Sequence, residues 1–146
     1  MFDHFVGATT EGKLTTDYGV LERYESNADA TVWTFVLKKG LKWHDGVEMT
    51  ADDLKFSIDR YARPTTLCGQ CGAGRANLDR VEVVDRSTVR LHLKQADTGI
   101  PVVFGPLEGN FMVLPKHRYE EVGAQGFENT PLGSGPWKFV KREIGQ

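Results

Sequence analysis

The motif in this sequence best suited to chemistry is a C-x-x-C pair, Cys68-Gly69-Gln70-Cys71. Such a pair can be a redox dithiol, half of a zinc site or a local disulfide. Thioredoxin-type redox chemistry needs the pair at the start of a helix that follows a strand, where the helix dipole lowers a thiol pKa. Here the pair follows a predicted helix and lies among glycines, and the four histidines offer zinc no second paired spacing. The pattern favours a local disulfide, which would contribute only about 2 kcal/mol because its loop is tiny.

Three of the histidines are predicted to have structural roles. His44 precedes Asp45 in a predicted turn, and no nucleophile is placed by the sequence to use it, so a hydrogen bond that stabilises the turn is expected. His92 falls on the polar face of a predicted strand. His117 stands near the start of a predicted helix, where a surface or capping role is expected.

The glycine-rich segment around the cysteines offers a second kind of chemistry. The backbone amides of Gly69, Gly72 and Gly74, with the guanidinium of Arg75, could bind an anion. The segment lacks the Lys-Ser/Thr ending of a phosphate-binding loop. A flexible loop is the alternative interpretation.

The elements that must position these groups are concentrated in one continuous block, residues 33–61. Trp33, Phe35 and Leu37 alternate with their neighbours and predict a strand with one face against a core. Gly40 and the pair Asp45-Gly46 then predict two turns, since these residue types tolerate a positive φ.

A capped helix is predicted to end this block. The Thr50 hydroxyl can accept a hydrogen bond from the Asp53 amide, and Asp52 and Asp53 place negative charge on the first turn, where the helix dipole favours it. An apolar stripe along one helix face is predicted to be buried. The stripe consists of Leu54, Phe56, Ile58, Tyr61 and Ala62, while Asp52, Lys55 and Asp59 face water.

The remaining segments predict an α+β fold with a mixed, mostly antiparallel sheet and a few helices. Residues 22–26 and 31–38 form one predicted hairpin, and residues 81–93 form a second, with its turn at Asp85-Arg86-Ser87. The other predictions are a loop at 62–77, a short helix starting at Pro101, a strand at 111–114, a helix from Pro115 through Val122 that ends at Gly123, and a strand at 138–141.

Composition narrows the possible functions. The 146 residues, 40% of them hydrophobic, suffice for one domain with a core and are too few for two. A net charge of -2 excludes a strongly basic surface for nucleic acid, and no apolar run approaches the roughly 20 residues that span a bilayer. Residues 1–5 lack the basic and apolar regions of an export signal.

The block at 33–53 resembles the signature of the extracytoplasmic solute-binding proteins of ABC importers for peptides, dipeptides and nickel. In the family's order, it carries Trp33-Thr34-Phe35, Lys39-Gly40, Trp43-His44-Asp45-Gly46 and Thr50-Ala51-Asp52-Asp53. Residues 113–117 also resemble the family's Pro-Lys-His segment, and residues 131–137 resemble its Gly-Thr-Gly-Pro-aromatic segment. Because family members are several times longer and exported, the resemblance implies that this chain is a fragment.

The resemblance implies a periplasmic-binding-protein-like bilobal fold that closes over its ligand. Residues 1–131 would be the smaller, accessory domain, and residues 132–146 would begin the crossing into the main ligand-binding lobe. The hinge or crossing residues would be Gly133, Ser134, Gly135 and Pro136. Since an exported protein meets an oxidising compartment, Cys68 and Cys71 are expected to be bridged to each other.

The function that the resemblance implies is capture of a peptide-like solute outside the cytoplasm, in the periplasm or at the cell envelope, and its delivery to the permease of an ABC importer. No catalysis is expected, and no binding of a cofactor, a metal or nucleic acid. Contact with the membrane is expected only through the permease. Loop 62–77 would line the cleft edge, with Arg63, Gln70, Arg75 and Asn77 as polar contacts or simply as solvated residues. The alternatives are a small C-x-x-C redox protein and a structural or interaction domain without a ligand.

Overall fold

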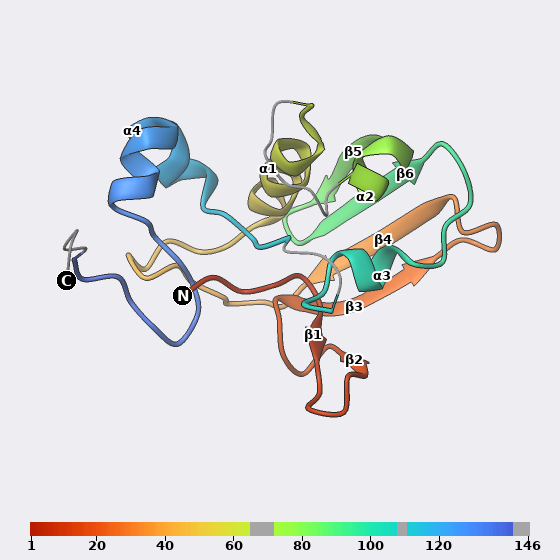
Figure 1. Ribbon diagram of the computed structural model, residues 1–146, viewed down its shortest axis with the longest axis horizontal. Helices are drawn as coiled ribbons and strands as arrows, with labels where there is room; N and C mark the ends of the chain where they lie inside the picture. The colour runs from red at the N-terminus through yellow and green to blue at the C-terminus, as the bar shows by residue number, and fades with distance from the viewer. Residues whose placement is uncertain (65–71, 108–110, 142–146) are drawn as a thin grey trace.

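The computed structural model describes residues 1–64, 72–107 and 111–141, and its main feature is a four-stranded antiparallel sheet (Figure 1). The strands are β3 (Leu21–Ser26), β4 (Val32–Leu37), β5 (Leu78–Asp85) and β6 (Thr88–Leu93), paired in the order β3-β4-β6-β5. A separate small ribbon joins β1 (Gly7–Ala8) to β2 (Leu14–Thr15). The described helices are α1 (Ala51–Ala62), α2 (Gly72–Asn77), α3 (Ile100–Val103) and α4 (Lys116–Asn129). This is the predicted α+β fold.

Both predicted hairpins are confirmed. Strand β4 is central, because it pairs with β3 on one side and with β6 on the other. Trp33, Phe35 and Leu37 are buried, while the alternating residues of β4 are only half-buried. Strands of an antiparallel sheet with one covered face show this alternation, so the period of two in the sequence identified the core-facing side chains.

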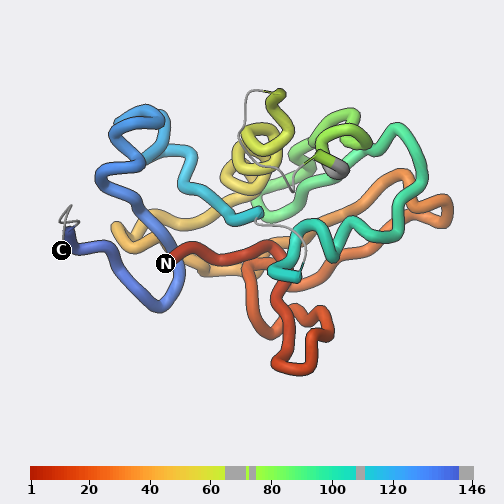
Figure 2. The backbone as a smooth tube through the Cα atoms, in the orientation of Figure 1, coloured from red at the N-terminus to blue at the C-terminus, as the bar shows by residue number. Residues whose placement is uncertain are grey.

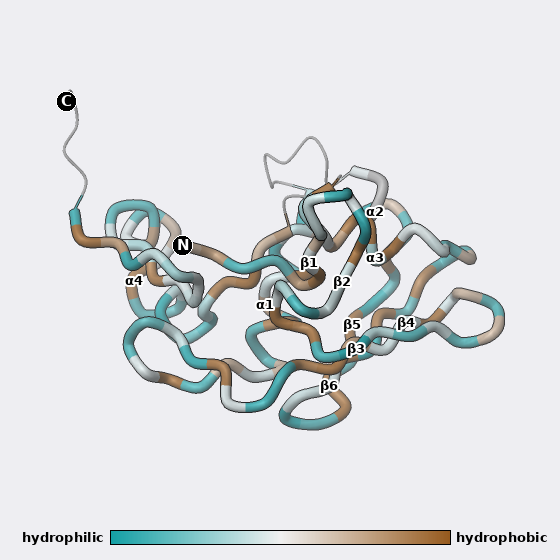
Figure 3. The backbone as a smooth tube through the Cα atoms, turned by 90° about the horizontal axis from the view of Figure 1, so that it is seen from below, coloured by the Kyte–Doolittle hydropathy of each residue, from teal (hydrophilic) through white to brown (hydrophobic). Residues whose placement is uncertain are grey.

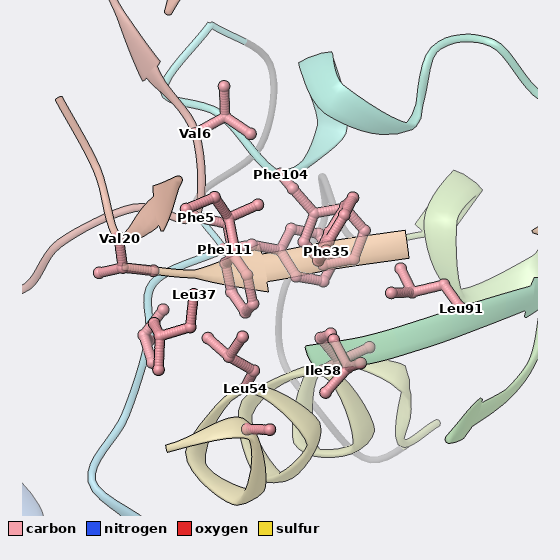
Figure 4. Close-up of a cluster of buried hydrophobic side chains, with 14 of the residues drawn as sticks. Phe5, Val6, Val20, Phe35, Leu37, Leu54, Ile58, Leu91, Phe104 and Phe111 are labelled. Carbon is pink, nitrogen blue, oxygen red and sulfur yellow. The ribbon is translucent and has the colours of Figure 1, made fainter. Parts of the chain in front are cut away.

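The core lies between the inner face of the sheet, helix α1 and the N-terminal segment (Figure 4). The Phe35 ring meets the Phe104 ring edge-on at 5.4 Å between centroids, and Phe5 meets Phe104 at 5.1 Å. Figure 4 shows Leu54 and Ile58 of α1 directed toward strand β4 and this aromatic group. Both side chains are almost completely buried, which confirms the centre of the predicted stripe on α1. The other members of the stripe are only half-buried, namely Phe56, Tyr61 and Ala62.

Helix α1 begins at the predicted cap. Thr50 and Asp53 form a capping box, and Asp53 Oδ2 accepts from the Thr50 amide at 2.9 Å. The same carboxylate also accepts from the Lys116 amide through Oδ1 at 2.9 Å, so it joins the N-termini of α1 and α4. Asp53 is buried, which the sequence did not predict; its negative charge there suits both helix dipoles.

A second buried polar side chain of α1 holds the segment before α4. The Ser57 hydroxyl donates to the Asp53 carbonyl at 2.7 Å and accepts from the Leu114 amide at 2.8 Å. The strand predicted at 111–114 is wrong: this segment forms one isolated bridge, between His4 and Met112. The Leu114 and Met112 amides donate to side-chain hydroxyls of α1, and the Val113 amide donates to the Asp3 carbonyl at 2.9 Å.

Two other sequence predictions need correction. Within the predicted loop 62–77, residues 72–77 form helix α2, although they have no hydrophobic period. The end of α2 is held by tertiary contacts, since the Asn77 carbonyl accepts from the Lys94 amide at 2.8 Å. Residues 138–141 form no strand, because they have no neighbouring strand in the described part of the chain.

The end of α4 was predicted in part. Gly123 has a φ of 71°, which only glycine adopts without strain, and it interrupts the helix at the expected position. The helix then resumes and ends at Asn129. Among the described residues, no helix is long and apolar enough to cross a membrane.

Candidate functional site

The turn at residues 43–46 lies against residues 133–135, which are far from it in sequence. The His44 amide donates to the Gly133 carbonyl at 2.9 Å. The His44 Nε2 atom lies 2.6 Å from the Gly135 carbonyl oxygen, 91 positions away. Because a carbonyl oxygen can only accept, this ring nitrogen carries the proton and donates. The hydrogen bond predicted for His44 exists, but it joins the turn to a distant segment.

The N-terminal residues complete this contact region. The Gly135 amide donates to the Met1 carbonyl at 2.8 Å, and the Ser134 hydroxyl donates to Asp3 Oδ2 at 2.7 Å. A Cβ atom on Gly133 would overlap the Met1 carbonyl, so the close approach requires glycine at that position. Figures 1 and 2 show the N-terminus beside the segment that follows α4. We call residues 1–3, 43–46 and 133–135 together the junction.

The neighbouring carboxylate of the turn binds helix α4. Asp45 Oδ2 accepts from His117 Nε2 at 2.8 Å, and Asp45 Oδ1 accepts from the Val47 amide at 3.1 Å. Partial burial opposes ionisation of Asp45, yet these hydrogen bonds outweigh it and lower the pKa of the carboxyl below its ordinary value. The turn therefore fixes α4 as well as residues 133–135.

Acidification is expected to weaken the link between the turn and α4. The pKa of Asp45 in the folded state lies below 3.8, so the ionised carboxylate contributes stability above that pH and loses it as the pH falls through the lowered pKa. Asp45→Asn should therefore flatten the decline in unfolding free energy below a pH of about 4. Denaturant titrations at a series of pH values measure this, with the exposed Asp29→Asn as control. Parallel profiles for Asp45→Asn and the unsubstituted chain would contradict the assignment.

The structure places the predicted solute contacts apart from the junction. Arg63 is exposed just after α1. Arg75 Nη1 donates to the Pro64 carbonyl at 3.5 Å, which brings Arg75 close to Arg63. Asn77 faces the segment after β6, since its side chain donates to the Gln95 carbonyl at 3.1 Å and accepts from the Gln95 amide at 2.9 Å.

The other predicted residues of this loop lie outside the described part of the chain. They are Gln70 and the cysteines Cys68 and Cys71, with Gly69 between them. The disulfide therefore remains a prediction. Among the described residues, no group of three or more His, Cys, Asp and Glu side chains could hold a metal ion.

Sequence reasoning missed the junction as a unit. Its parts were singled out separately, as the turn at 43–46 and the hinge residues 133–136. No sequence pattern indicates the roles of Met1 and Asp3, because Met1 contributes a backbone carbonyl and Asp3 a single carboxylate. The glycines at 133 and 135 were the available clue, since paired glycines often mark a close backbone approach.

A family comparison covers most of the fold and the part of the junction that follows residue 15. The family model described as "Bacterial extracellular solute-binding proteins, family 5 Middle" matches residues 15–146. The chain belongs to this family of solute-binding proteins. The match includes both the turn at 43–46 and residues 133–135, so the predicted resemblance is confirmed.

Curated relatives of this family 5 chain are named as peptide-binding proteins. A putative ABC transporter peptide-binding protein of Brucella ovis is 32% identical over 139 residues, covering 90% of this chain and 25% of the relative. The oligopeptide-binding protein AppA of Bacillus subtilis is 30% identical over 145 residues, covering 94% of this chain and 26% of AppA. The chain thus spans about a quarter of the length of the curated relatives it matches.

Solved structures of related binding proteins share the fold. MoaA of A. tumefaciens R10, in complex with mannopinic acid, superposes with a TM-score of 0.87 at 29% identity, covering 100% of this chain and 29% of MoaA. NikZ of Campylobacter jejuni, in complex with Ni(L-His), gives a TM-score of 0.84 at 26% identity, covering 99% of this chain and 28% of NikZ. AppA of Bacillus subtilis, in complex with a nonapeptide, gives a TM-score of 0.80 at 26% identity, covering 100% of this chain and 29% of AppA.

The family 5 chain exposes apolar side chains beyond the junction. Trp137 is 77% exposed and Val140 is 86% exposed. Figure 3 shows a hydrophobic stretch just before the grey C-terminal residues. Next to it lies an open groove of about 260 Å³. Its lining residues are Asp45, Arg118, Glu121, Thr130, Pro131, Leu132 and Phe139.

Proposed function

We propose that this chain is part of an extracytoplasmic solute-binding protein that captures a peptide-like solute and delivers it to the permease of an ABC importer. Residues 1–131 are the accessory domain, and residues 132–146 begin the crossing into the main lobe. The observation that carries the proposal is the similarity to AppA, which holds in sequence over 145 residues and in fold over 100% of the chain.

The fold of the described residues supports an accessory role. Trp137 and Val140, beyond the junction, are exposed apolar side chains, and such side chains suit contact with further protein. The junction gathers residues 1–3 and 133–135 at one place, which suits a domain connected to a neighbour by two adjacent segments. The proposed site of action is the periplasm or the outside of the cell envelope, with no enzymatic activity.

The cleft edge is proposed to be the loop at 62–77, with Arg63, Gln70, Arg75 and Asn77 as polar contacts. Arg63 fits this role best among the described members, because its side chain is exposed. The Asn77 side chain forms hydrogen bonds with Gln95 and Asp97 within the domain, so its contribution to the cleft would be to fix the end of α2. Arg75 would act similarly, through the Pro64 carbonyl.

The chain alone is expected to bind no peptide tightly, whereas the protein from the complete reading frame should bind with micromolar or better affinity. Small-ligand sites typically bury about 70 to 90% of the ligand surface, and in a bilobal protein that enclosure needs both lobes. Isothermal calorimetry with a mixed di- to pentapeptide library measures both proteins. Micromolar binding by residues 1–146 would mean that the accessory domain contains a complete pocket.

Parallel titrations identify the solute class. Mannopinic acid and Ni(L-His), the ligands in the MoaA and NikZ structures, are the matched alternatives to the peptides. Binding of either one by the complete protein, without peptide binding, would keep the solute-binding function and replace the proposed solute. If the complete protein binds neither the peptides, nor mannopinic acid, nor Ni(L-His), the proposed function is contradicted.

A further inference from the structure

We propose that His44 is a positioning residue that fixes the direction in which the chain leaves this domain at residues 133–135, and thereby the orientation of the domain relative to the main lobe. The inference rests on the proposed function, because it takes residues 132–146 as the crossing between lobes. His44 itself need not touch solute.

The contacts of His44 hold the crossing segment at two carbonyl groups, those of Gly133 and Gly135. The backbone amide of His44 binds the Gly133 carbonyl at 2.9 Å, and its ring binds the Gly135 carbonyl at 2.6 Å. Lys138 Nζ reaches back to the His44 carbonyl at 3.4 Å. Three contacts along six residues leave this segment little freedom to rotate about its own axis.

The crossing segment depends on these donors because it is buried. Gly133 and Gly135 are both buried, and buried carbonyl groups need hydrogen-bond partners. On the other side the segment lies directly on Met1, through the Gly135 amide. Residues 133–135 are therefore held between the N-terminal segment and the His44 side chain.

The turn that carries His44 is rigid enough to position a neighbour. Trp43 is buried in the core, its amide donates to the Val47 carbonyl at 2.9 Å, and the Gly46 amide donates to the Trp43 carbonyl at 2.9 Å. Asp45 is bound to His117 of α4. A side chain on a turn fixed to the core and to a helix can transmit the orientation of the whole domain to the segment it binds.

Loss of the imidazole should loosen the crossing without unfolding the domain. The Gly135 carbonyl would lose its donor, and residues 133–135 would sample more directions. A lobe that samples more orientations spends a smaller fraction of its time in the orientation that closes over solute. The apparent affinity for solute falls in proportion to that fraction. We expect solute affinity of the complete protein to weaken by about threefold to tenfold in His44→Ala.

The test compares His44→Ala with two matched variants. His44→Gln keeps a nitrogen donor at the same number of bonds from Cβ as Nε2, so it should restore the hydrogen bond to Gly135. His92→Ala removes an imidazole that is bound to Glu82 at 2.9 Å on the sheet, far in sequence from the junction. It controls for loss of a histidine as such.

The first measurement is hydrogen exchange by NMR on the 146-residue chain. The Gly135 amide should exchange about tenfold faster in His44→Ala, the equivalent of one hydrogen bond, while amides of the central strand β4 stay unchanged. His44→Gln and His92→Ala should match the unsubstituted chain at Gly135. Unchanged exchange at Gly135, or an equal rise in β4, would overturn the positioning role.

The second measurement is small-angle X-ray scattering of the complete protein without solute. His44→Ala should broaden the distribution of interlobe distances, and His44→Gln should return it to that of the unsubstituted protein. An identical distribution in His44→Ala would overturn the proposal. Neither measurement needs a ligand. A complete protein that binds none of the three solutes would contradict the proposed function, and the role of His44 would still be decided by these two results.

Discussion

Leu54→Ala is expected to lower the free energy of unfolding by about 2 to 5 kcal/mol. Leu54 has no exposed surface and lies between helix α1 and the aromatic core, so its removal leaves a cavity that the surrounding rings can fill only in part. Denaturant unfolding, with the slope compared between variants, measures the loss.

Two variants on the same part of the chain calibrate this result. Thr50→Ala should cost about 1 kcal/mol, because it removes only the side chain of the helix cap. Val47→Ala should change stability by less than about 0.5 kcal/mol, since Val47 is 46% exposed. Equal and negligible losses for Leu54→Ala and Thr50→Ala would show that α1 does not pack as described.

Asp53→Ala should destabilise the chain by about 2 to 5 kcal/mol, because it removes a buried carboxylate and leaves two partly buried backbone donors without their acceptor. These donors are the amides of Thr50 and Lys116, each 2.9 Å from a different carboxylate oxygen. The loss should appear in the unfolding free energy and as faster hydrogen exchange of the Lys116 amide.

The matched control for Asp53 is its neighbour Asp52. Asp52 lies on the same first turn of α1 but is exposed, so Asp52→Ala loses only a favourable interaction with the helix dipole, about 0.3 to 1 kcal/mol. The loss of unfolding free energy in Asp53→Asn should lie between those of Asp53→Ala and Asp52→Ala, since the asparagine side chain keeps one acceptor oxygen. If Asp53→Ala costs no more than Asp52→Ala, the carboxylate does not join the two helices.

Local patterns were sufficient to predict most elements of the sheet and helix α1. The alternation of Trp33, Phe35 and Leu37 reflects burial of one sheet face, and Gly40 and Gly46 have the positive φ that their turns require. These features depend on neighbours within a few positions. A single sequence contains such information directly.

The features that sequence reasoning missed depend on distant partners. Helix α2 is held at Asn77 by Lys94 and Gln95, and the predicted strand at 111–114 is replaced by contacts with Ser57 and His4. The burial of Asp53 follows from its contact with Lys116, 63 positions away. Polar side chains of this kind look the same in a sequence whether they meet water or another segment.

The sequence supports the solute contacts proposed for loop 62–77 less strongly than it supports the sheet. Arg63, Arg75 and Asn77 belong to residue types that are common in solvated loops. Their roles depend on where the loop lies in the closed protein, and the sequence pattern contains no periodicity that reports this.

The junction also bears on how the chain folds during synthesis. Ser134 binds Asp3 across 131 positions, so Asp3 can find this partner only after more than a hundred further residues have been made. Hairpins β3-β4 and β5-β6 can form locally while the chain is still growing, but the N-terminal segment must wait for residues 133–135 to emerge. Contacts with such a large sequence separation slow folding. Until they form, the N-terminal residues remain accessible to chaperones and proteases.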